Sequence, residues 1–143
     1  MSYSERTKQK ETASDTDVSS AADKLTFSPA VAAEILEFGY IVTTAFVDAA
    51  GGLVLKADIR PTAGSDSSRG DGDAGVMTLT SAQANKAAGK VVRTRPASPA
   101  IVYPGQQVVL QLTTAADSGA GLAFIVWREA FKADQTAETV VAA

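Results

Sequence analysis

The amino-acid sequence predicts an all-β protein, a jelly roll or β-sandwich of about eight antiparallel strands with a flexible N-terminal arm. Three observations predict this fold. Short runs rich in β-branched and aromatic residues recur along the chain, Gly and Pro turns separate them, and convincing helical segments are scarce. The length of 143 residues suits one domain with one core, and a parallel α/β fold is disfavoured.

The first segment, residues 1–24, mixes charges of both signs with Ser and Thr, and Val18 is its sole member of the set Leu, Ile, Val and Phe. Such a segment buries too little apolar surface to offset the entropy that it loses on ordering. We therefore expect a mobile arm. We also hypothesise that its deletion leaves the domain folded but weakens attachment to a partner.

The composition becomes apolar at Leu25, so the β domain is expected over residues 25–132. Residues 133–143 form a weakly apolar C-terminal tail. Its Val140 and Val141 could add a strand to another sheet.

Three strands are expected in the first part of the domain. The run 31–38 (VAAEILEF) suits helix or strand, and its length between a Pro and a Gly favours a strand. The run 40–47 (YIVTTAFV) is rich in strand-forming residues. A glycine-containing turn over 48–52 leads into an alternating run over 53–60, which predicts a hairpin.

Residues 61–75 (PTAGSDSSRGDGDAG) carry no large apolar side chain, so a long exposed loop is expected there. A short strand over 76–80 follows. Residues 81–90 suit one helical turn or a second loop. A polar strand over 91–95 then leads into an extended, proline-bracketed connection.

The last part of the domain has the clearest strand pattern. Residues 100–103 predict a short strand, and Pro104-Gly105 fits the centre of a type II turn. The run 107–114 (QVVLQLTT) places apolar residues at every second position, which indicates one buried face. The run 122–128 (LAFIVWR) is apolar enough for a central strand.

The composition excludes several classes of function. Thirteen basic and 16 acidic residues give a net charge of -3, so the chain has no cationic excess for nucleic acid or an anionic membrane. His and Cys are both absent, which excludes Cys/His zinc sites, Ser-His-Asp triads and Cys-His pairs. A cupin-like enzyme is disfavoured for the same reason. We therefore expect a non-enzymatic protein without metal or cofactor.

The first residues lack the apolar core of a secretory signal, and no run of about 18 apolar residues could span a bilayer. The sequence thus predicts synthesis in the cytoplasm and no membrane partner.

Three short motifs could suggest other functions. Arg69-Gly70-Asp71 matches an integrin-binding tripeptide, but three residues are weak support and turn chemistry explains them. Asp66, Asp71 and Asp73 could offer oxygen ligands to Ca²⁺, but the EF-hand spacing is not met. Glu34 and Glu37 could form a catalytic carboxylate pair, yet their odd separation places them on opposite faces of a strand.

Basic residues gather near one predicted strand. Arg93 and Arg95 share a face and, with Arg60 and Lys90, could form a patch that binds a negatively charged protein surface. Charges that blunt an edge strand against unwanted pairing explain them equally well. The large aromatic residues lie inside apolar runs and are expected in the core rather than on a carbohydrate platform. They are Tyr40, Phe46, Phe124 and Trp127.

The stretch 102–114 (VYPGQQVVLQLTT), with the Gly-rich loop after it and residues 122–125 (LAFI), resembles the cement (decoration) proteins of tailed-bacteriophage capsids. The size, composition and polar arm of the chain are similar to that family too. The resemblance implies a jelly-roll domain that forms homodimers. It also implies a location in the virion, on the outer surface of an HK97-like shell, where the protein bridges and stabilises neighbouring major capsid proteins.

The expected partners are therefore the major capsid protein and a second copy of the chain, since exposed edge strands could pair across a two-fold axis. An arm that orders on its partner would supply part of the contact. The alternative is a carbohydrate- or cell-surface-binding β module of a phage fibre or adhesin, which would expose aromatic side chains on loops. The candidate capsid contacts are Tyr3, Arg6, Lys8, Lys10, Arg60, Lys90, Arg93 and Arg95.

Overall fold

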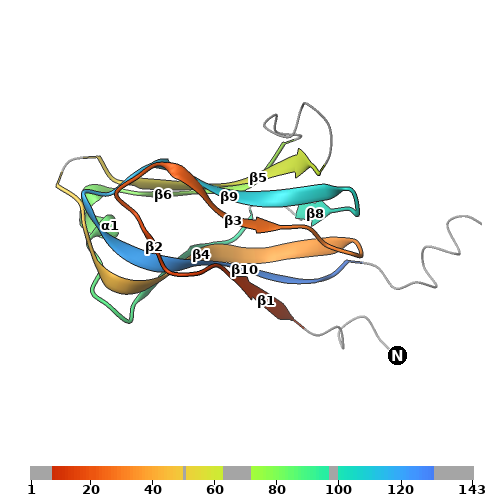
Figure 1. Ribbon diagram of the computed structural model, residues 1–143, viewed down its shortest axis with the longest axis horizontal. Coiled ribbons are helices and arrows are strands. Elements are labelled where there is room, and N and C mark those ends of the chain that lie inside the picture. Colours follow the sequence, from red (N-terminus) through yellow and green to blue (C-terminus); the bar gives the residue numbers. More distant parts are fainter. Residues whose placement is uncertain (1–7, 50, 63–71, 97–99, 131–143) are drawn as a thin grey trace, which may run out of the picture.

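The computed structural model describes residues 8–49, 51–62, 72–96 and 100–130, which form two antiparallel sheets packed face to face (Figure 1). Sheet A consists of β1 (Gln9–Thr12), β2 (Thr16–Asp17), β4 (Ala33–Val47), β7 (Val91–Thr94), β8 (Ala100–Val102) and β10 (Ser118–Glu129). Sheet B consists of β3 (Ala22–Phe27), β5 (Leu53–Pro61), β6 (Gly72–Leu79) and β9 (Gln106–Thr114). The predicted all-β sandwich is confirmed.

The order of the strands is that of a jelly roll. Sheet A runs β1-β10-β4-β7, with β2 also on β10 and β8 also on β4, and sheet B runs β3-β9-β5-β6. If β1 with β2, and β7 with β8, each count as one position, the ten strands occupy eight positions. Their orders are then 1-8-3-6 and 2-7-4-5, so the chain wraps alternately through both sheets.

The mobile arm predicted for residues 1–24 is wrong for residues 8–24. Strand β1 pairs with β10 in the register Gln9 to Trp127, β2 continues along the same strand, and β3 already begins at Ala22. Val18 is fully buried. A polar segment can order here because its backbone groups hydrogen-bond to a strand that is already part of the sheet, and Val18 anchors it in the core. It therefore does not need the apolar face that an independent element would need. Residues 1–7 lie outside the described part of the chain.

Two of the predicted strands are one. The runs 31–38 and 40–47 join through Gly39 into the 15 residues of β4, which confirms the strand interpretation of the first run. The predicted hairpin over 40–60 is wrong, because β4 lies in sheet A and β5 lies in sheet B. The turn after β4 therefore crosses between the layers, as the jelly roll requires.

The remaining elements follow the sequence closely. The helical alternative for residues 81–90 is confirmed by α1 (Ser81–Ala84), whose first turn is closed by a capping box between Thr80 and Gln83. Gly105 has a φ of 91° and Gln106 N donates to Tyr103 O at 2.9 Å, the geometry of the predicted type II turn. The loop predicted over residues 61–75 is wrong at both ends, because β5 extends through Pro61 and β6 begins at Gly72. Residues 63–71 of this predicted loop lie outside the described residues.

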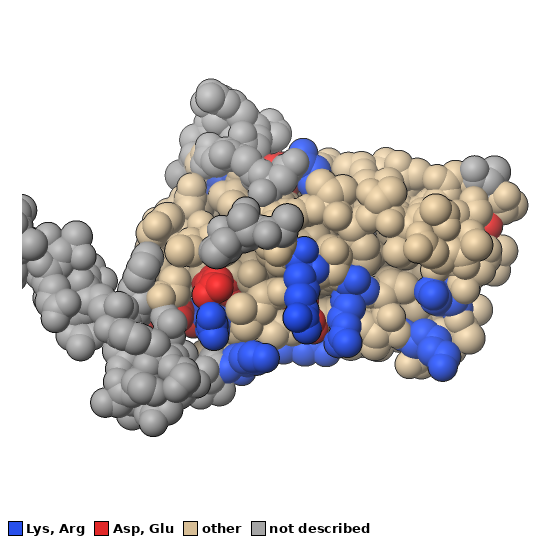
Figure 2. All heavy atoms as spheres, turned by 180° about the vertical axis from the view of Figure 1, so that it is seen from behind, with Lys and Arg blue, Asp and Glu red and all other residues tan. Residues whose placement is uncertain are grey.

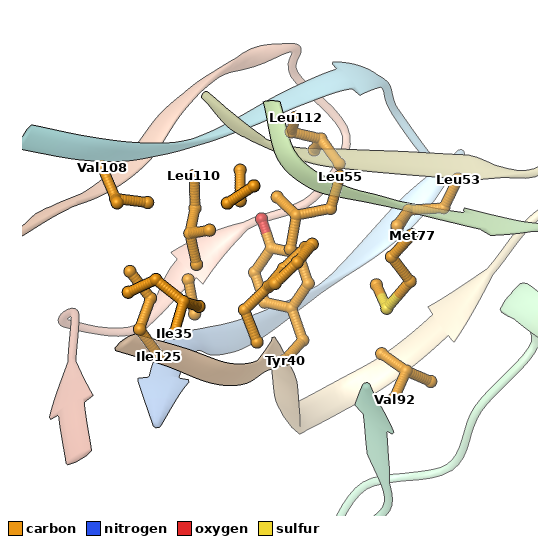
Figure 3. Packing of buried hydrophobic residues seen from close by; sticks show 14 of the residues in the cluster. Ile35, Tyr40, Leu53, Leu55, Met77, Val92, Val108, Leu110, Leu112 and Ile125 are labelled. Atoms are coloured by element: carbon orange, nitrogen blue, oxygen red, sulfur yellow. The ribbon is translucent and has the colours of Figure 1, made fainter. Parts of the chain in front are cut away.

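The core lies between the sheets (Figure 3). The apolar face predicted for the run 107–114 points into it, and Val108, Leu110 and Leu112 are at most 1% exposed. Side chains from both layers meet there, and sheet A contributes Ile35, Tyr40, Val92 and Ile125 while sheet B contributes Leu53, Leu55 and Met77. The longer strands thus bury one face in the core, and their other face lies on the outside of the sandwich.

Candidate functional site

The outer face of sheet A carries side chains from four adjacent strands. Val126 on β10 is in register with Lys10 on β1 and with Glu37 on β4, while Arg93 on β7 faces Gly39. Their chain neighbours Trp127, Phe38 and Val92 point into the core. Because side chains alternate along a strand, Val126, Glu37 and Arg93 point away from the core.

These side chains line a shallow groove of about 460 Å³. Its floor is apolar and its rim is basic. Figure 2 shows a face of the molecule on which Lys and Arg side chains are more prominent than Asp and Glu. We call it the basic groove, and its lining residues are Lys8, Leu36, Glu37, Arg93, Arg95, Val126 and Arg128.

The arginines of the rim form long ion pairs with Glu37. Arg93 Nη1 lies 3.7 Å from Glu37 Oε1, and Arg95 Nε lies 3.9 Å from Glu37 Oε2. The two arginine side chains are 61% and 79% exposed, whereas Glu37 is 18% exposed. Exposed pairs at such distances contribute about 0–1 kcal/mol, so the guanidinium groups remain accessible to another carboxylate.

A break in the strand register forms the floor. Val126 pairs with Glu37 while Trp127 pairs with Ile35, so Leu36 has no partner on β10. This β-bulge places Leu36 and Glu37 in the groove together, although they are neighbours in sequence. Val126, half-buried on β10, lies beside them.

The bulge also overturns the expectation for the two glutamates. Glu34 and Glu37 were predicted on opposite faces of a strand, but both lie on the outer face of sheet A. The extra residue in the bulge shifts the alternation of side chains by one position, so an odd separation now joins residues on the same face. Glu34 Oε1 accepts from Arg128 Nε at 3.2 Å and lies 3.1 Å from Arg128 Nη2. Each glutamate is thus the counter-ion of a rim arginine.

Lys10 extends the basic surface along β1. Its Nζ lies 4.7 Å from the centre of the Phe124 ring, which is the distance of a cation–π contact. Phe124 is 2% exposed and alternates with the core residues of β10, so it lies on the outer face beneath β1. The contact helps to hold the polar edge strand in place.

The fold brings together four of the predicted contact residues: Lys8, Lys10, Arg93 and Arg95. Sequence reasoning missed the contribution of Arg128 and Glu37. The alternation of the run 122–128 indicates that Arg128 points away from the buried side. The sequence does not indicate which strands lie next to it, so Arg128 could not be assigned to the patch. Tyr3 and Arg6 lie outside the described residues.

Lys90 lies next to β7 and is exposed, but it does not line the groove. Its backbone oxygen accepts from Val42 N at 2.8 Å, and this bond fixes the entry to the strand. The edge position expected for the strand 91–95 is confirmed, because β7 ends the order of sheet A.

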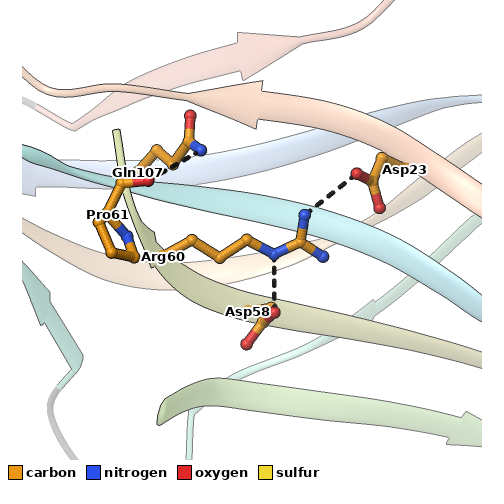
Figure 4. Close-up of polar contacts among 5 residues, drawn as sticks. All are labelled: Asp23, Asp58, Arg60, Pro61 and Gln107. Carbon is orange, nitrogen blue, oxygen red and sulfur yellow. Dashed lines mark hydrogen bonds and ion pairs between the residues drawn. The ribbon is translucent and has the colours of Figure 1, made fainter. Parts of the chain in front are cut away.

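The prediction that Arg60 belongs to the basic patch is wrong. Its side chain is 9% exposed, and its Nε donates to Asp58 Oδ2 at 2.8 Å while its Nη1 donates to Asp23 Oδ2 at 3.1 Å (Figure 4). These bonds span β5 and β3 in sheet B, in the other layer of the sandwich. The guanidinium is therefore a structural link between strands and takes no part in the groove.

The other motifs lie mostly outside the part of the chain that the structure describes. Residues 69–71, with Asp66 and Asp71, lie outside the described residues, and Asp73 is part of β6. Of the four aromatic residues expected in the core, Tyr40, Phe46 and Trp127 lie in it, whereas Phe124 is buried on the outer face of sheet A. Tyr103, at the turn after β8, is 49% exposed.

Comparison of the chain with protein-family models, with curated proteins and with solved structures finds no match. In the described part of the chain, no helix has the length and apolar character needed to cross a membrane.

Proposed function

We propose that this chain is a non-catalytic structural protein that binds another protein through the outer face of sheet A. Its specific role would be that of a cement protein on a tailed-bacteriophage capsid, bridging and stabilising neighbouring major capsid proteins at the outer surface. The observation that carries the proposal is the basic groove, an exposed cationic surface with an apolar floor on a rigid two-layer scaffold.

The groove suits a protein partner better than a nucleic acid. The whole chain has a net charge of -3, so it lacks the cationic excess that a phosphate backbone would need. The floor is Leu36 and Val126, so it has no aromatic ring on which a base could stack. A mixed apolar and charged surface is typical of protein interfaces.

Binding of many copies to one capsid would make weak individual contacts sufficient for the proposed role. A single exposed charged surface of this kind gives modest affinity, because rim charges contribute more to association rate and specificity than to binding energy. Copies linked to one another on a lattice bind with a high effective concentration. Weak contacts can then reinforce a capsid durably. The resemblance of residues 102–114 to cement proteins points in the same direction.

One observation favours the carbohydrate-binding alternative. Tyr103 is an exposed aromatic side chain at a turn, the position in which a sugar platform would need it. A single ring gives a small platform. If Tyr103→Ala abolished binding of the chain to bacterial cells or glycans and left capsid attachment intact, this alternative would hold.

The direct test is attachment to empty phage heads that lack this protein. Purified chain should cosediment with the heads and raise the temperature at which they break open. The double variant Arg93→Glu with Arg95→Glu should lose most of the attachment, whereas Lys90→Glu, an exposed cation outside the groove, should retain it. No cosedimentation of the wild-type chain would contradict the proposal.

A further inference from the structure

We infer that the basic groove selects an extended acidic segment of its partner, in which two carboxylates four residues apart flank an apolar side chain. This inference rests on the proposed function and specifies the chemistry of the partner. The segment would cross the strands of sheet A, with the apolar side chain on the floor and one carboxylate at each side of the rim.

The width of the groove sets the spacing of the carboxylates. Arg93 and Arg95 belong to the β7 side, whereas Lys8 belongs to the β1 side, and the strand order β1-β10-β4-β7 puts three steps between them. Neighbouring strands lie about 4.8 Å apart, so the backbones that carry the two sides are roughly 14 Å apart. An extended peptide advances about 3.3 Å per residue, hence about 13 Å over four residues.

The floor sets the nature of the middle residue. Leu36 on β4 and Val126 on β10 occupy the two central strands of the groove. In an extended segment the side chains at positions i, i+2 and i+4 share one face. The residue midway between the carboxylates therefore faces the floor, and an aliphatic side chain there would bury apolar surface against both residues.

The rim has unused donor capacity. Each guanidinium has five N–H donors, and those of Arg93 and Arg95 lie 3.7 and 3.9 Å from Glu37, too far for good hydrogen bonds. The pair between Arg60 and Asp58 shows the contrast, with 2.8 Å between its atoms. A partner carboxylate could approach the arginines in bidentate geometry, which Glu37 does not use.

Two other occupants fit less well. A second copy bound through the same face would bring two patches with an excess of positive charge together, because an isologous contact pairs the patch with itself. A free phosphate could bind the arginines but would leave Leu36 and Val126 uncovered. Charge complementarity and the apolar floor together favour the acidic segment.

The test uses the full chain and a synthetic peptide, GDTLTDG, blocked at both ends and labelled with a fluorophore. At about 50 mM salt, where screening is weak, anisotropy should show saturable binding. Replacement of both Asp by Asn should weaken binding at least tenfold, and replacement of Leu by Ser should weaken it severalfold. The peptide GTDLDTG, with its carboxylates two residues apart, should bind less tightly because it cannot reach both sides.

The variants assign the binding to the groove. Arg93→Glu with Arg95→Glu should lower peptide affinity at least tenfold, and Arg95→Ala, a milder change, should lower it severalfold. Lys90→Glu should leave the affinity within twofold. The far-ultraviolet spectrum and thermal midpoint of each variant should match those of the wild-type chain.

Equal binding of the Asp and Asn peptides would overturn the inference. Competition by inorganic phosphate at the concentration of the peptide would overturn it too, because it would reveal a simple anion site. If the chain attaches to heads but the peptide does not bind, the inference fails while the proposed function stands. If the peptide binds and heads are not decorated, the selected chemistry stands and the capsid role fails.

Discussion

Tyr40 is buried between the sheets, and its hydroxyl has no hydrogen-bond partner among the described residues. Its ring packs edge-on against Phe46, with 5.7 Å between the ring centres. Burial raises the pKa of the Tyr40 phenol well above its ordinary value, and the nearby Asp17 carboxylate raises it further. The native fold therefore opposes ionisation of this residue.

Tyr40 should make the fold sensitive to alkali. A raised native pKa gives a contribution that is complete below the unfolded-state pKa, near about 10, and is lost as the pH rises beyond it. Above that pH the wild-type chain should lose up to about 1.4 kcal/mol per pH unit more than Tyr40→Phe. Urea midpoints from pH 8 to 11 would measure the difference. Parallel pH curves for the two chains would contradict the assignment.

Arg60 forms a buried ion pair with Asp58. Asp58 is 6% exposed in its side chain, and its hydrogen bond raises the pKa of Arg60 above the ordinary range. Arg60→Met would leave the Asp58 carboxylate buried without its cation and should cost about 3 kcal/mol. The double variant Arg60→Met with Asp58→Leu should recover most of that loss. Denaturant titration of both variants checks the pairing, and equal losses would count against it.

Strands β4 and β7 approach each other closely at Gly39. A Cβ on this residue would lie 1.9 Å from the backbone oxygen of Val92, so no larger residue fits without displacing β7. This approach matters for the groove, because β7 carries Arg93 and leads to Arg95. A single glycine in the middle of a long strand thus fixes one side of the candidate site.

We expect Gly39→Ala to destabilise the fold by about 2 kcal/mol or more and to weaken peptide binding. Gly51→Ala is the matched control, since its Cβ would have nothing within 4 Å. Thermal unfolding and peptide anisotropy would be measured on both variants. Comparable behaviour of the two would show that β7 tolerates displacement.

The N-terminal strands form the second element whose role depends on the fold. They pair with the edge of β10, and Val18 after them belongs to the core. Deletion of residues 1–24 should therefore destabilise the chain by about 3 kcal/mol or more, contrary to the sequence-based hypothesis. Deletion of residues 1–7 leaves every described strand in place and should change stability by less than about 0.5 kcal/mol.

The shorter deletion also tests the contact roles predicted for Tyr3 and Arg6. If they bind the capsid, it should weaken attachment to heads while the unfolding curve stays unchanged. Undiminished attachment would remove both residues from the set of contacts. Loss of stability in the shorter deletion would show that residues 1–7 support the fold.

At the scale of the whole molecule, the jelly roll leaves six of the described strands at sheet edges: β1, β2, β7 and β8 in sheet A, and β3 and β6 in sheet B. Charges protect β7, because Arg93 and Arg95 would meet like charges in a second copy. Strand β6 carries the exposed Val76, which is 46% exposed. We therefore expect self-association through the β6 edge, which keeps the basic groove free for another protein.

Sedimentation velocity over a wide concentration range should show a monomer–dimer equilibrium. Val76→Lys, which adds a charge to the β6 edge, should shift it toward monomer. Val31→Lys is the control, since Val31 is 44% exposed and lies outside the strands. A mass that stays monomeric at every concentration would contradict the expected homodimer.

Local patterns in the sequence were sufficient for the strands from β4 onward and for most of the core. The alternation of Val108, Leu110 and Leu112 needs no knowledge of the neighbours of the strand, because any pleated strand with that pattern buries one face. The absence of His and Cys likewise limits the available chemistry before any fold is known. The alternation of side chains along a strand likewise predicted that Arg93 and Arg95 share one face.

The tertiary structure alone decided which distant segments meet. The wrapping of the jelly roll brings Lys8, Arg93 and Arg128 to one face and moves Arg60 into an ion pair in sheet B. It also orders β1 and β2 against β10 and β3 against β9. A bulge at Leu36 then places both glutamates beside the arginines. Such contacts depend on strand order and register, which arise from pairing across the whole chain and leave no periodic signal in any one segment.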